Sequence, residues 1–336
     1  MKILLAAVLS AALLSSCAVG RSTSKPDWID GPSAKYSDTQ FLIGRGQANN
    51  QEDAKDRARA DLAKIFEVSI NVESEDTQTY KSASAQGKTE AQNVAQVSRT
   101  IATRTDQIIQ GVQITEIWQQ PATKTYYALA VLPRLQAANS LRQEIERLDT
   151  ATQNDIEQAR NNPDLLAKIA AASRALNAQM QRQSYQKSLK ILDRTGRGLE
   201  PQWNIGKLAS DLDAVLKRVH IAPRISPDSP GELATMLSGG LSAAGFLTET
   251  GQNPDYLLEA SLQLNDLGIQ DSWHWFRGTL EIKLSEQANG RIRGTKRWDI
   301  KSSAQQQTVA RQRAIEQTDT ILKKDLYNAI IGFVTN

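Results

Sequence analysis

The chain contains a single thiol, and the residues around it indicate what it reacts with. Cys17 is the one cysteine among 336 residues. It follows Leu14-Ser15-Ser16, and a leucine, two small residues and a cysteine form the pattern at which bacterial signal peptidases cut a leader. Small residues fit the peptidase, and the cysteine thiolate is the nucleophile that accepts a lipid. The pattern predicts that Cys17 carries an acyl anchor such as palmitate and is not a catalytic thiol.

The residues before Cys17 have the character of a secretory leader. Lys2 gives a positive start, and Ile3 to Leu14 is an apolar run too short to cross a bilayer as a helix. We therefore expect residues 1–16 to be a signal peptide and residues 17–26, which are small and polar, to be a lipidated tether. An ordinary leader with a chance cysteine is the alternative.

The residue after the cysteine indicates in which bacterial membrane the protein is anchored. It is Ala18 and not an aspartate, which favours the outer membrane under the usual sorting rule for bacterial lipoproteins. Each buried CH₂ of an acyl chain is worth about 0.8 kcal/mol, and roughly two chains give stable attachment. We therefore expect a protein that is lipid-anchored in the outer membrane and faces the periplasm.

A pair of glycines raises the question of nucleotide binding. Gly44 and Gly46 end an apolar run and precede an alanine-rich helical pattern. A dinucleotide-binding turn needs a third small residue where Asn49 stands, and no Gly-Lys-Ser/Thr follows for a phosphate-binding loop. We therefore expect no nucleotide. We interpret the glycines as positions where a strand and a helix pass closely.

Other residues that could do chemistry lack partners at suitable spacing. His220 and His274 are the two histidines, and neither shows the neighbours of a metal site or a Ser-His pair. The carboxylates Asp211 and Asp213 fit the polar face of a helix. The formal net charge of +3 is close to neutral for this length and gives no argument for nucleic acid. The sequence predicts no catalytic residue, no metal and no cofactor.

The segment Trp273-His274-Trp275-Phe276-Arg277 is the most suggestive cluster. In a strand, Trp273, Trp275 and Arg277 share one face, and the other two side chains share the opposite face. We expect the tryptophan face to pack in the core, because large aromatic side chains are usually buried. The alternative is a binding surface for protein or glycan formed by Trp273, Trp275 and Arg277.

The helix and strand patterns of the sequence predict a mixed α+β or α/β protein, in which two small α/β domains are joined by a helical hairpin. For the first domain, residues 27–134, the patterns predict the order β-α-β-α-β-β. The expected strands are 40–44, 68–72, 112–118 and 126–132, the expected helices are 53–66 and 94–108, and residues 73–93 are expected to form a mobile excursion.

The remaining chain divides into a helical and a mixed part. Residues 135–195 show two apolar stripes on either side of Asn161-Asn162-Pro163, which predicts a helical hairpin. Residues 196–336 predict a C-terminal α/β domain with an antiparallel meander, including a tight turn at Asn289-Gly290. The expected strands are 256–267, 273–282 and 292–300, and the expected helices are 208–219, 233–241 and 309–330.

Three segments together resemble a known family. They are PDWID at 26–30, FLIGRGQA at 41–48 and TEIWQQPATKTYYALAVLPR at 115–134, and the alanine-rich helical pattern at 53–66 and the expected strand VSINV at 68–72 lie between the last two. They are similar to the LPP-twenty (LPP20) lipoprotein family, which has related modules in flagellar assembly protein T. The resemblance covers about a third of the chain, Pro26 to Arg134. It implies a surface or scaffold domain and transfers no catalytic residue.

The C-terminal domain resembles, more weakly, periplasmic modules of envelope-assembly lipoproteins, such as the curli secretion lipoprotein and the outer-membrane activators of penicillin-binding proteins. Together these patterns predict a non-enzymatic, outer-membrane lipoprotein that acts as a binding or scaffold factor for another envelope protein. The alternatives are an envelope enzyme acting on cell-wall glycan and a flagellar or secretion assembly accessory. A carboxylate with a strongly shifted pKa in a pocket would favour the enzyme.

Overall fold

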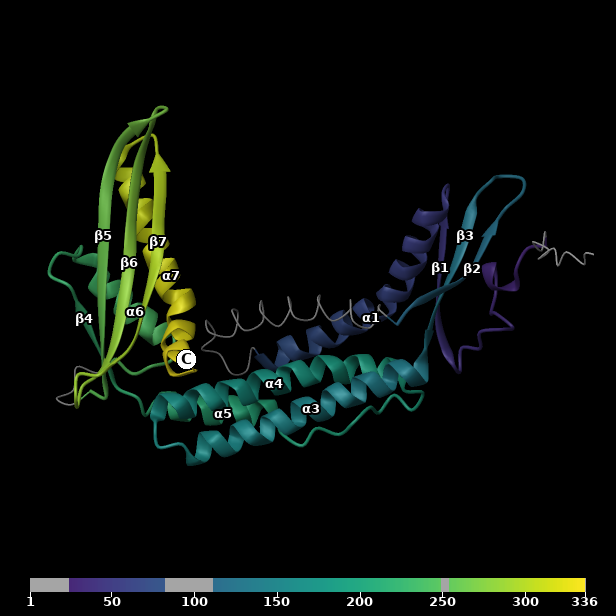
Figure 1. The fold of residues 1–336 in the computed structure, drawn as a ribbon, viewed down its shortest axis with the longest axis horizontal. Coiled ribbons are helices and arrows are strands. Elements are labelled where there is room, and N and C mark those ends of the chain that lie inside the picture. Colours follow the sequence, from purple (N-terminus) through teal and green to yellow (C-terminus); the bar gives the residue numbers. More distant parts are fainter. Residues whose placement is uncertain (1–23, 82–110, 249–253, 336) are drawn as a thin grey trace, which may run out of the picture. The chain divides into compact units, whose positions relative to one another are not determined.

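The computed structural model in Figure 1 describes residues 24–81, 111–248 and 254–335, with the backbone alone for 67–81 and 335. Cys17 and the predicted helix at 94–108 lie outside the described residues. The chain divides into two compact units. One contains residues up to 62 together with 113–131, and the other contains 63–112 together with 132–336. Both units contain helices and strands, so the expected α+β class is confirmed.

The first unit is built on a three-stranded sheet. Its strands are β1 (Phe41–Ala48), β2 (Gln113–Gln119) and β3 (Tyr126–Pro133), in the order β1-β3-β2. β2 and β3 pair antiparallel, with an irregularity between Ile114 and Glu116. The three strands correspond to strands expected from the sequence. Trp28 packs beside Leu129 and Val131 in a core cluster of this unit.

Helix α1 (Gln51–Lys81) is longer than expected. The predicted strand at 68–72 is wrong, because these residues continue the helix, and the excursion predicted from residue 73 is helical as far as Lys81. The alternation of Val68, Ile70 and Val72 suggested a strand. The sequence also repeats apolar residues every four positions at Leu62, Phe66 and Ile70, and no glycine or proline interrupts the helix.

The glycine pair in β1 lies where α1 crosses the strand. A Cβ atom on Gly46 would stand 1.9 Å from the carbonyl oxygen of Ala54, and one on Gly44 would stand 2.3 Å from that of Ala58. Ala54 and Ala58 are themselves fully buried. The helix backbone therefore lies directly on the strand, which confirms the expected close passage.

The second unit contains the predicted helical hairpin, α3 (Arg134–Asn161) and α4 (Leu165–Leu192). Asp164 caps α4, since its carboxylate accepts hydrogen bonds from the amides of Leu166 and Ala167. The apolar stripe of α3 is buried as expected except at Leu135, which is exposed. Helix α5 (Ile205–Leu216) follows and contacts α4.

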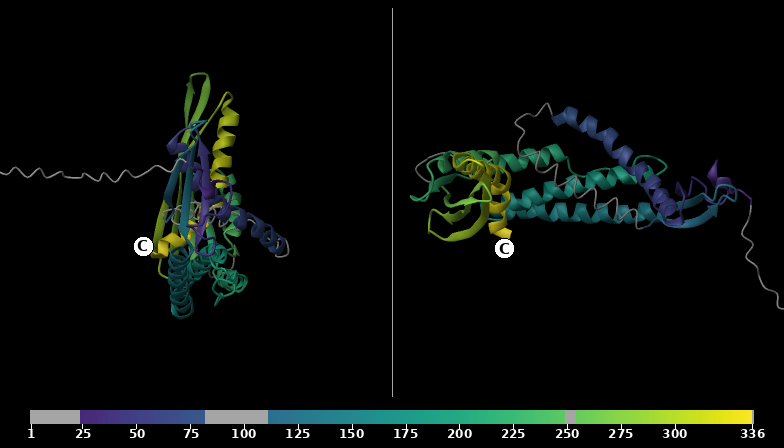
Figure 2. Two further views of the ribbon diagram at one scale, coloured as in Figure 1. Left: turned by 90° about the vertical axis from the view of Figure 1, so that its right-hand side faces the viewer. Right: turned by 90° about the horizontal axis from the view of Figure 1, so that it is seen from above.

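The chain ends in a four-stranded sheet with the order β4-β5-β6-β7. The first pair is parallel and the others are antiparallel. Helices α6 and α7 pack against one face, as Figures 1 and 2 show. β4, which contains Pro223, and β7 are the two edges. The elements are β4 (Ile221–Ile225), α6 (Glu232–Ala243), β5 (Tyr256–Gln270), β6 (Trp273–Glu286), β7 (Ile292–Ala304) and α7 (Gln307–Thr335).

The meander and helices expected for this part of the chain are therefore confirmed. Within residues 24–81, 111–248 and 254–335, no helix combines the length and the apolar character needed to cross a membrane.

Candidate functional site

The aromatic strand lies at one end of the C-terminal sheet, and its tryptophans face outward. Trp273 and Trp275 are 40% and 39% exposed. Phe276, the next residue along the strand, is only 7% exposed. The prediction that the tryptophan face packs in the core is wrong. The buried face of β6 belongs instead to alternate residues that begin at Phe276 and continue through Leu280, Ile282 and Leu284.

Two residues of the neighbouring strand add apolar surface at the same end. Leu267 and Ile269 are 48% and 65% exposed, and they flank a bulge in β5. Half of the large apolar side chains that are exposed in the described part of the chain therefore lie in one hairpin. We call Leu267, Ile269, Trp273 and Trp275 the hairpin tip. Figure 1 shows the hairpin that joins β5 and β6 at the top of the sheet, at the opposite end of β5 from the part beside β4.

The hairpin tip is held in a defined conformation. Asp271 and Ser272 form the two-residue connection with φ values of 50° and 64°, the left-handed geometry that matches the twist of paired strands. Asp266 accepts a hydrogen bond from the amide of Gly268 at 2.8 Å and another from Gln307 of α7. The Gly268 amide lowers the pKa of the Asp266 carboxyl most, followed by Gln307. Bulge and turn are therefore fixed by local hydrogen bonds.

A charged surface borders the tip on the same face of the sheet. Arg277 stands opposite Lys301 of β7, and farther along Glu281 forms an ion pair with Arg297. Trp275 donates a long hydrogen bond, 3.4 Å, from its indole nitrogen to the carbonyl oxygen of Gln270. The face thus changes from apolar at the tip to charged in the middle of the sheet, the arrangement of an apolar patch with a polar rim.

The histidines and the shifted carboxyls do not converge in the described residues. At the surface, the Nδ1 atom of His220 lies 3.6 Å from a carboxylate oxygen of Asp255. Among the described residues, no three histidine, cysteine or acidic side chains come together as a group that could hold a metal ion. The carboxyls of Asp193, Asp266 and Glu286 have a lowered pKa, each through hydrogen bonds to its charged form. A general acid would need the opposite shift.

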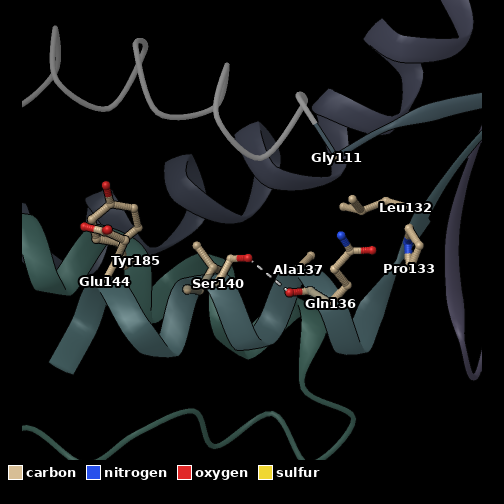
Figure 3. Close-up of a pocket in the computed structure, with 9 residues that line it drawn as sticks. Gly111, Leu132, Pro133, Gln136, Ala137, Ser140, Glu144 and Tyr185 are labelled. Atoms are coloured by element: carbon tan, nitrogen blue, oxygen red, sulfur yellow. Dashed lines mark hydrogen bonds between the residues drawn. The ribbon is translucent and has the colours of Figure 1, made fainter. Parts of the chain in front are cut away.

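One hollow lies beside the first turns of α3. It has a volume of about 160 Å³, and Gln136, Ser140, Glu144 and Tyr185 are among its lining residues (Figure 3). The Ser140 hydroxyl donates to the backbone carbonyl of Gln136 at 3.3 Å. Glu144 accepts from Arg147 on the same helix at 2.9 Å. The serine and the carboxylate are thus bonded within their own helix, and they do not pair as a nucleophile and a base.

Residues 26–133 match the model of the LPP20 lipoprotein family. The resemblance to this family that the sequence predicts is confirmed for this part of the chain, about a third of its length. The match supports a membrane-anchored lipoprotein of the cell envelope. A search of curated proteins found no match for this chain.

Three solved structures are similar to the chain at low identity. Secreted protein HP1454 from Helicobacter pylori is 12% identical over 85% of this chain and 97% of that one, with a TM-score of 0.41. A minor lipoprotein from Acinetobacter baumannii is 16% identical over 34% and 87% of the two chains, with a TM-score of 0.26. Protein XCC0632 from Xanthomonas campestris is 17% identical over 35% and 86%, also with a TM-score of 0.26.

The sequence pattern indicates Trp273, Trp275 and Arg277 but not the two exposed apolar residues of β5, Leu267 and Ile269. The pattern predicts Leu267 as the last residue of a strand, and it does not single out Ile269. A signal was present, because the buried alternation from Phe276 to Leu284 forces the odd-numbered residues of β6 outward. No comparable signal marked the bulge in β5, which depends on Gly268 adopting a left-handed conformation.

Proposed function

We propose that this chain is a lipid-anchored outer-membrane protein that faces the periplasm and works by binding another envelope protein through the hairpin tip. The observation that carries the proposal is the exposure of Trp273 and Trp275 on a preformed hairpin. Tryptophan and arginine are the residues most enriched among those that dominate protein interfaces. Both types occur here on one face, with Arg277 next to the tryptophans along β6.

The size of the apolar surface supports the same proposal. Covering the exposed parts of both tryptophans would remove roughly 200 Å² from water, worth about 5 kcal/mol at ~25 cal/mol per Å² before the costs of association. Ile269 stands opposite His274 in the register, so it exposes further apolar surface on the other face of the same hairpin. The charged surface around Arg277 and Lys301 supplies the polar rim that protein interfaces usually have. A binding role fits these residues better than catalysis, since they offer apolar area and not paired acids.

Site-specific crosslinking in cells tests the proposed contact. A photoreactive residue replaces Gln270 in the full chain, because Gln270 is exposed and stands opposite Trp273 in the strand register. The control places it at Thr295, which is exposed on β7 away from the tip. We expect a discrete protein adduct from position 270 that is absent from position 295. The adduct should disappear when Trp275→Ala is added. Equal adducts from both positions, or adducts that contain lipid and no protein, would rule out the proposed contact.

The proposed anchor is tested separately. Cys17→Ser should abolish incorporation of a radiolabelled fatty acid, because the acceptor sulfur is lost. Ala18→Asp should keep the label but move the protein from the outer to the inner membrane fraction on a density gradient. Labelling of the Cys17→Ser chain would show that the lipid is attached elsewhere. A labelled Ala18→Asp chain that stays in the outer membrane would remove the support for the proposed location.

A further inference from the structure

A polar hollow of about 660 Å³ lies between α4 and the segment that leads into α5. It is distant in sequence from the hairpin tip and independent of the function proposed for the tip. Its volume falls within the range of roughly 300–1,000 Å³ typical of small-molecule sites. Its lining includes Lys190 of α4, and Arg197 and Trp203 of the returning segment.

The wall of the hollow is preformed by two side chains of α4. Gln186 donates to the carbonyl of Arg197 at 3.2 Å and accepts from the amide of Leu199 at 3.0 Å. Arg182, which is 3% exposed, donates to the carbonyl of Glu200 at 2.9 Å. These bonds attach the segment to the helix on both sides of Gly198. A ligand would therefore meet a wall that is already in place.

Gly198 is required by this arrangement. Its φ is +66°, and a Cβ atom there would stand 2.4 Å from the side-chain nitrogen of Gln186. A larger residue would be strained in this conformation and would displace the amide that holds the segment. The path of the segment along α4 therefore depends on Gly198 as well as on the hydrogen bonds of Gln186 and Arg182.

The lining is positively charged. The charge of Arg182 is balanced by Asp149, at 2.8 Å. Lys190 and Arg197 line the hollow and are exposed, and the lining contains the single carboxylate of Glu200. Lys187, which also lines it, is engaged within the chain. The charge of +1 that remains from Lys190, Arg197 and Glu200 favours an anionic ligand. It is too small and too localised for a nucleic-acid backbone, which needs an extended basic stripe.

The uncharged part of the lining indicates the rest of the ligand. Gln183 is exposed and presents a side-chain amide, which can both donate to and accept from hydroxyl groups. Asn204 adds the amide nitrogen of its side chain, while its oxygen accepts from the amide of Lys207. Trp203 is half-buried and lines the hollow, and an indole ring can pack against the C–H groups of a sugar. We propose that this hollow binds an anionic saccharide, a sugar that bears a phosphate or a carboxylate.

Calorimetry with the full chain in detergent tests the ligand class. The probes are a phosphorylated glucosamine disaccharide, the same disaccharide without phosphate, a disaccharide containing N-acetylmuramic acid, and inorganic phosphate. We expect at least one charged disaccharide to bind at least about tenfold more tightly than the neutral sugar and than phosphate. Whichever charged sugar binds identifies the source of the anion as phosphate or carboxylate. The proposal is wrong if neither charged sugar binds, or if the neutral sugar or phosphate alone binds as tightly.

Variants then place the binding in this hollow. Lys190→Gln combined with Arg197→Gln should weaken binding of the charged sugar about tenfold or more, and added salt should weaken binding to the unaltered chain. Lys324→Gln on α7 removes an exposed charge elsewhere and should leave binding unchanged. Trp203→Leu should weaken binding and Trp203→Phe should restore it, with melting temperatures measured for each. Unchanged affinity in the Lys190 and Arg197 double variant would overturn the assignment.

Discussion

Arg182 of α4 faces Asp149 of α3 with its Nε atom 2.8 Å from one carboxylate oxygen and 3.0 Å from the other. The pair is almost completely buried. Gln179 completes the network, because its amide nitrogen donates to Asp149 at 3.0 Å and to the hydroxyl of Thr152 at 2.8 Å. The two helices are therefore joined by a buried network of polar side chains, and the same arginine holds the segment beyond α4.

Removing one partner of this network should strongly lower the free energy of unfolding. Asp149→Ala leaves the Arg182 charge buried without its counterion, and we expect a loss of about 3–5 kcal/mol in the free energy of unfolding. Glu144→Ala on the same helix breaks an exposed pair with Arg147 and should cost less than about 1 kcal/mol. Urea unfolding followed by circular dichroism measures both. Similar losses in the two variants would contradict the role given to burial.

The glycine in β1 gives a second prediction. Gly46→Ala places a methyl group where the backbone of α1 already stands, so we expect a loss of at least about 3 kcal/mol, the upper end of the range for overpacking. Hydrogen exchange of the β1 amides provides a local measurement, and protection should fall by about 100-fold or more. Gly31→Ala is the matched control, since its new methyl group would meet the nearest atom at 3.8 Å. Equal protection in both variants would show that strand and helix can separate freely.

Adjacent residues of β6 should differ sharply in their effect on stability. Trp275→Ala removes an outward-facing side chain and should change the unfolding free energy by less than about 1 kcal/mol. Phe276→Ala empties a buried position and should cost about 3–5 kcal/mol. Urea unfolding of the two variants under the same conditions makes the comparison. A Trp275→Ala chain as unstable as Phe276→Ala would mean that the tryptophan packs in the core after all.

A pH dependence follows from Glu286, which accepts hydrogen bonds from Arg293 at 2.9 Å and Asn289 at 2.7 Å. The bond from Arg293 is the largest cause of the lowered pKa of the Glu286 carboxyl, followed by the bond from Asn289. Because the folded state lowers the pKa of Glu286, the ionised form of this carboxyl stabilises the fold. This stabilisation is present above the ordinary glutamate pKa of 4.5 and is lost as the pH falls through the lower folded value.

The test compares the unaltered chain with Glu286→Gln. Their difference in urea midpoint should be largest near about pH 7 and should shrink as the pH falls below 4.5 and through the lowered folded pKa, because the glutamate then becomes neutral like the glutamine. In an Arg293→Gln background the same substitution should have little effect at neutral or acid pH, because the main cause of the shift is gone. A difference that persists unchanged at acid pH would show that ionisation of Glu286 contributes nothing.

Sequence patterns predicted the C-terminal sheet well and α1 poorly, for a physical reason. In β6 the apolar residues from Phe276 to Leu284 alternate over a long stretch, so one period is favoured clearly. Around Val68, Ile70 and Val72 the alternation covers three residues, which a helix with a four-residue repeat accommodates equally well. The helix continues there because the sequence lacks a residue that would end it.

The two candidate sites could be predicted only in part. The tryptophans were visible as a cluster, but which face is buried depends on where α6 and α7 pack. The pairing of Arg182 with Asp149 joins residues 33 positions apart, and it requires the register of the hairpin between α3 and α4. The polar hollow forms only because the segment after α4 turns back along that helix, a path set by Gln186 and Gly198.

The edges of the C-terminal sheet limit how this protein can aggregate. β4 is five residues long and contains a proline, while β7 carries the cations Arg293, Lys296, Arg297 and Lys301. Short, proline-containing or strongly charged edges resist the addition of a strand from another molecule. Contacts through the apolar tip therefore have no continuous backbone template from which to propagate into fibrils. Such a chain could be crowded at high density on a membrane surface and still exchange its partners reversibly.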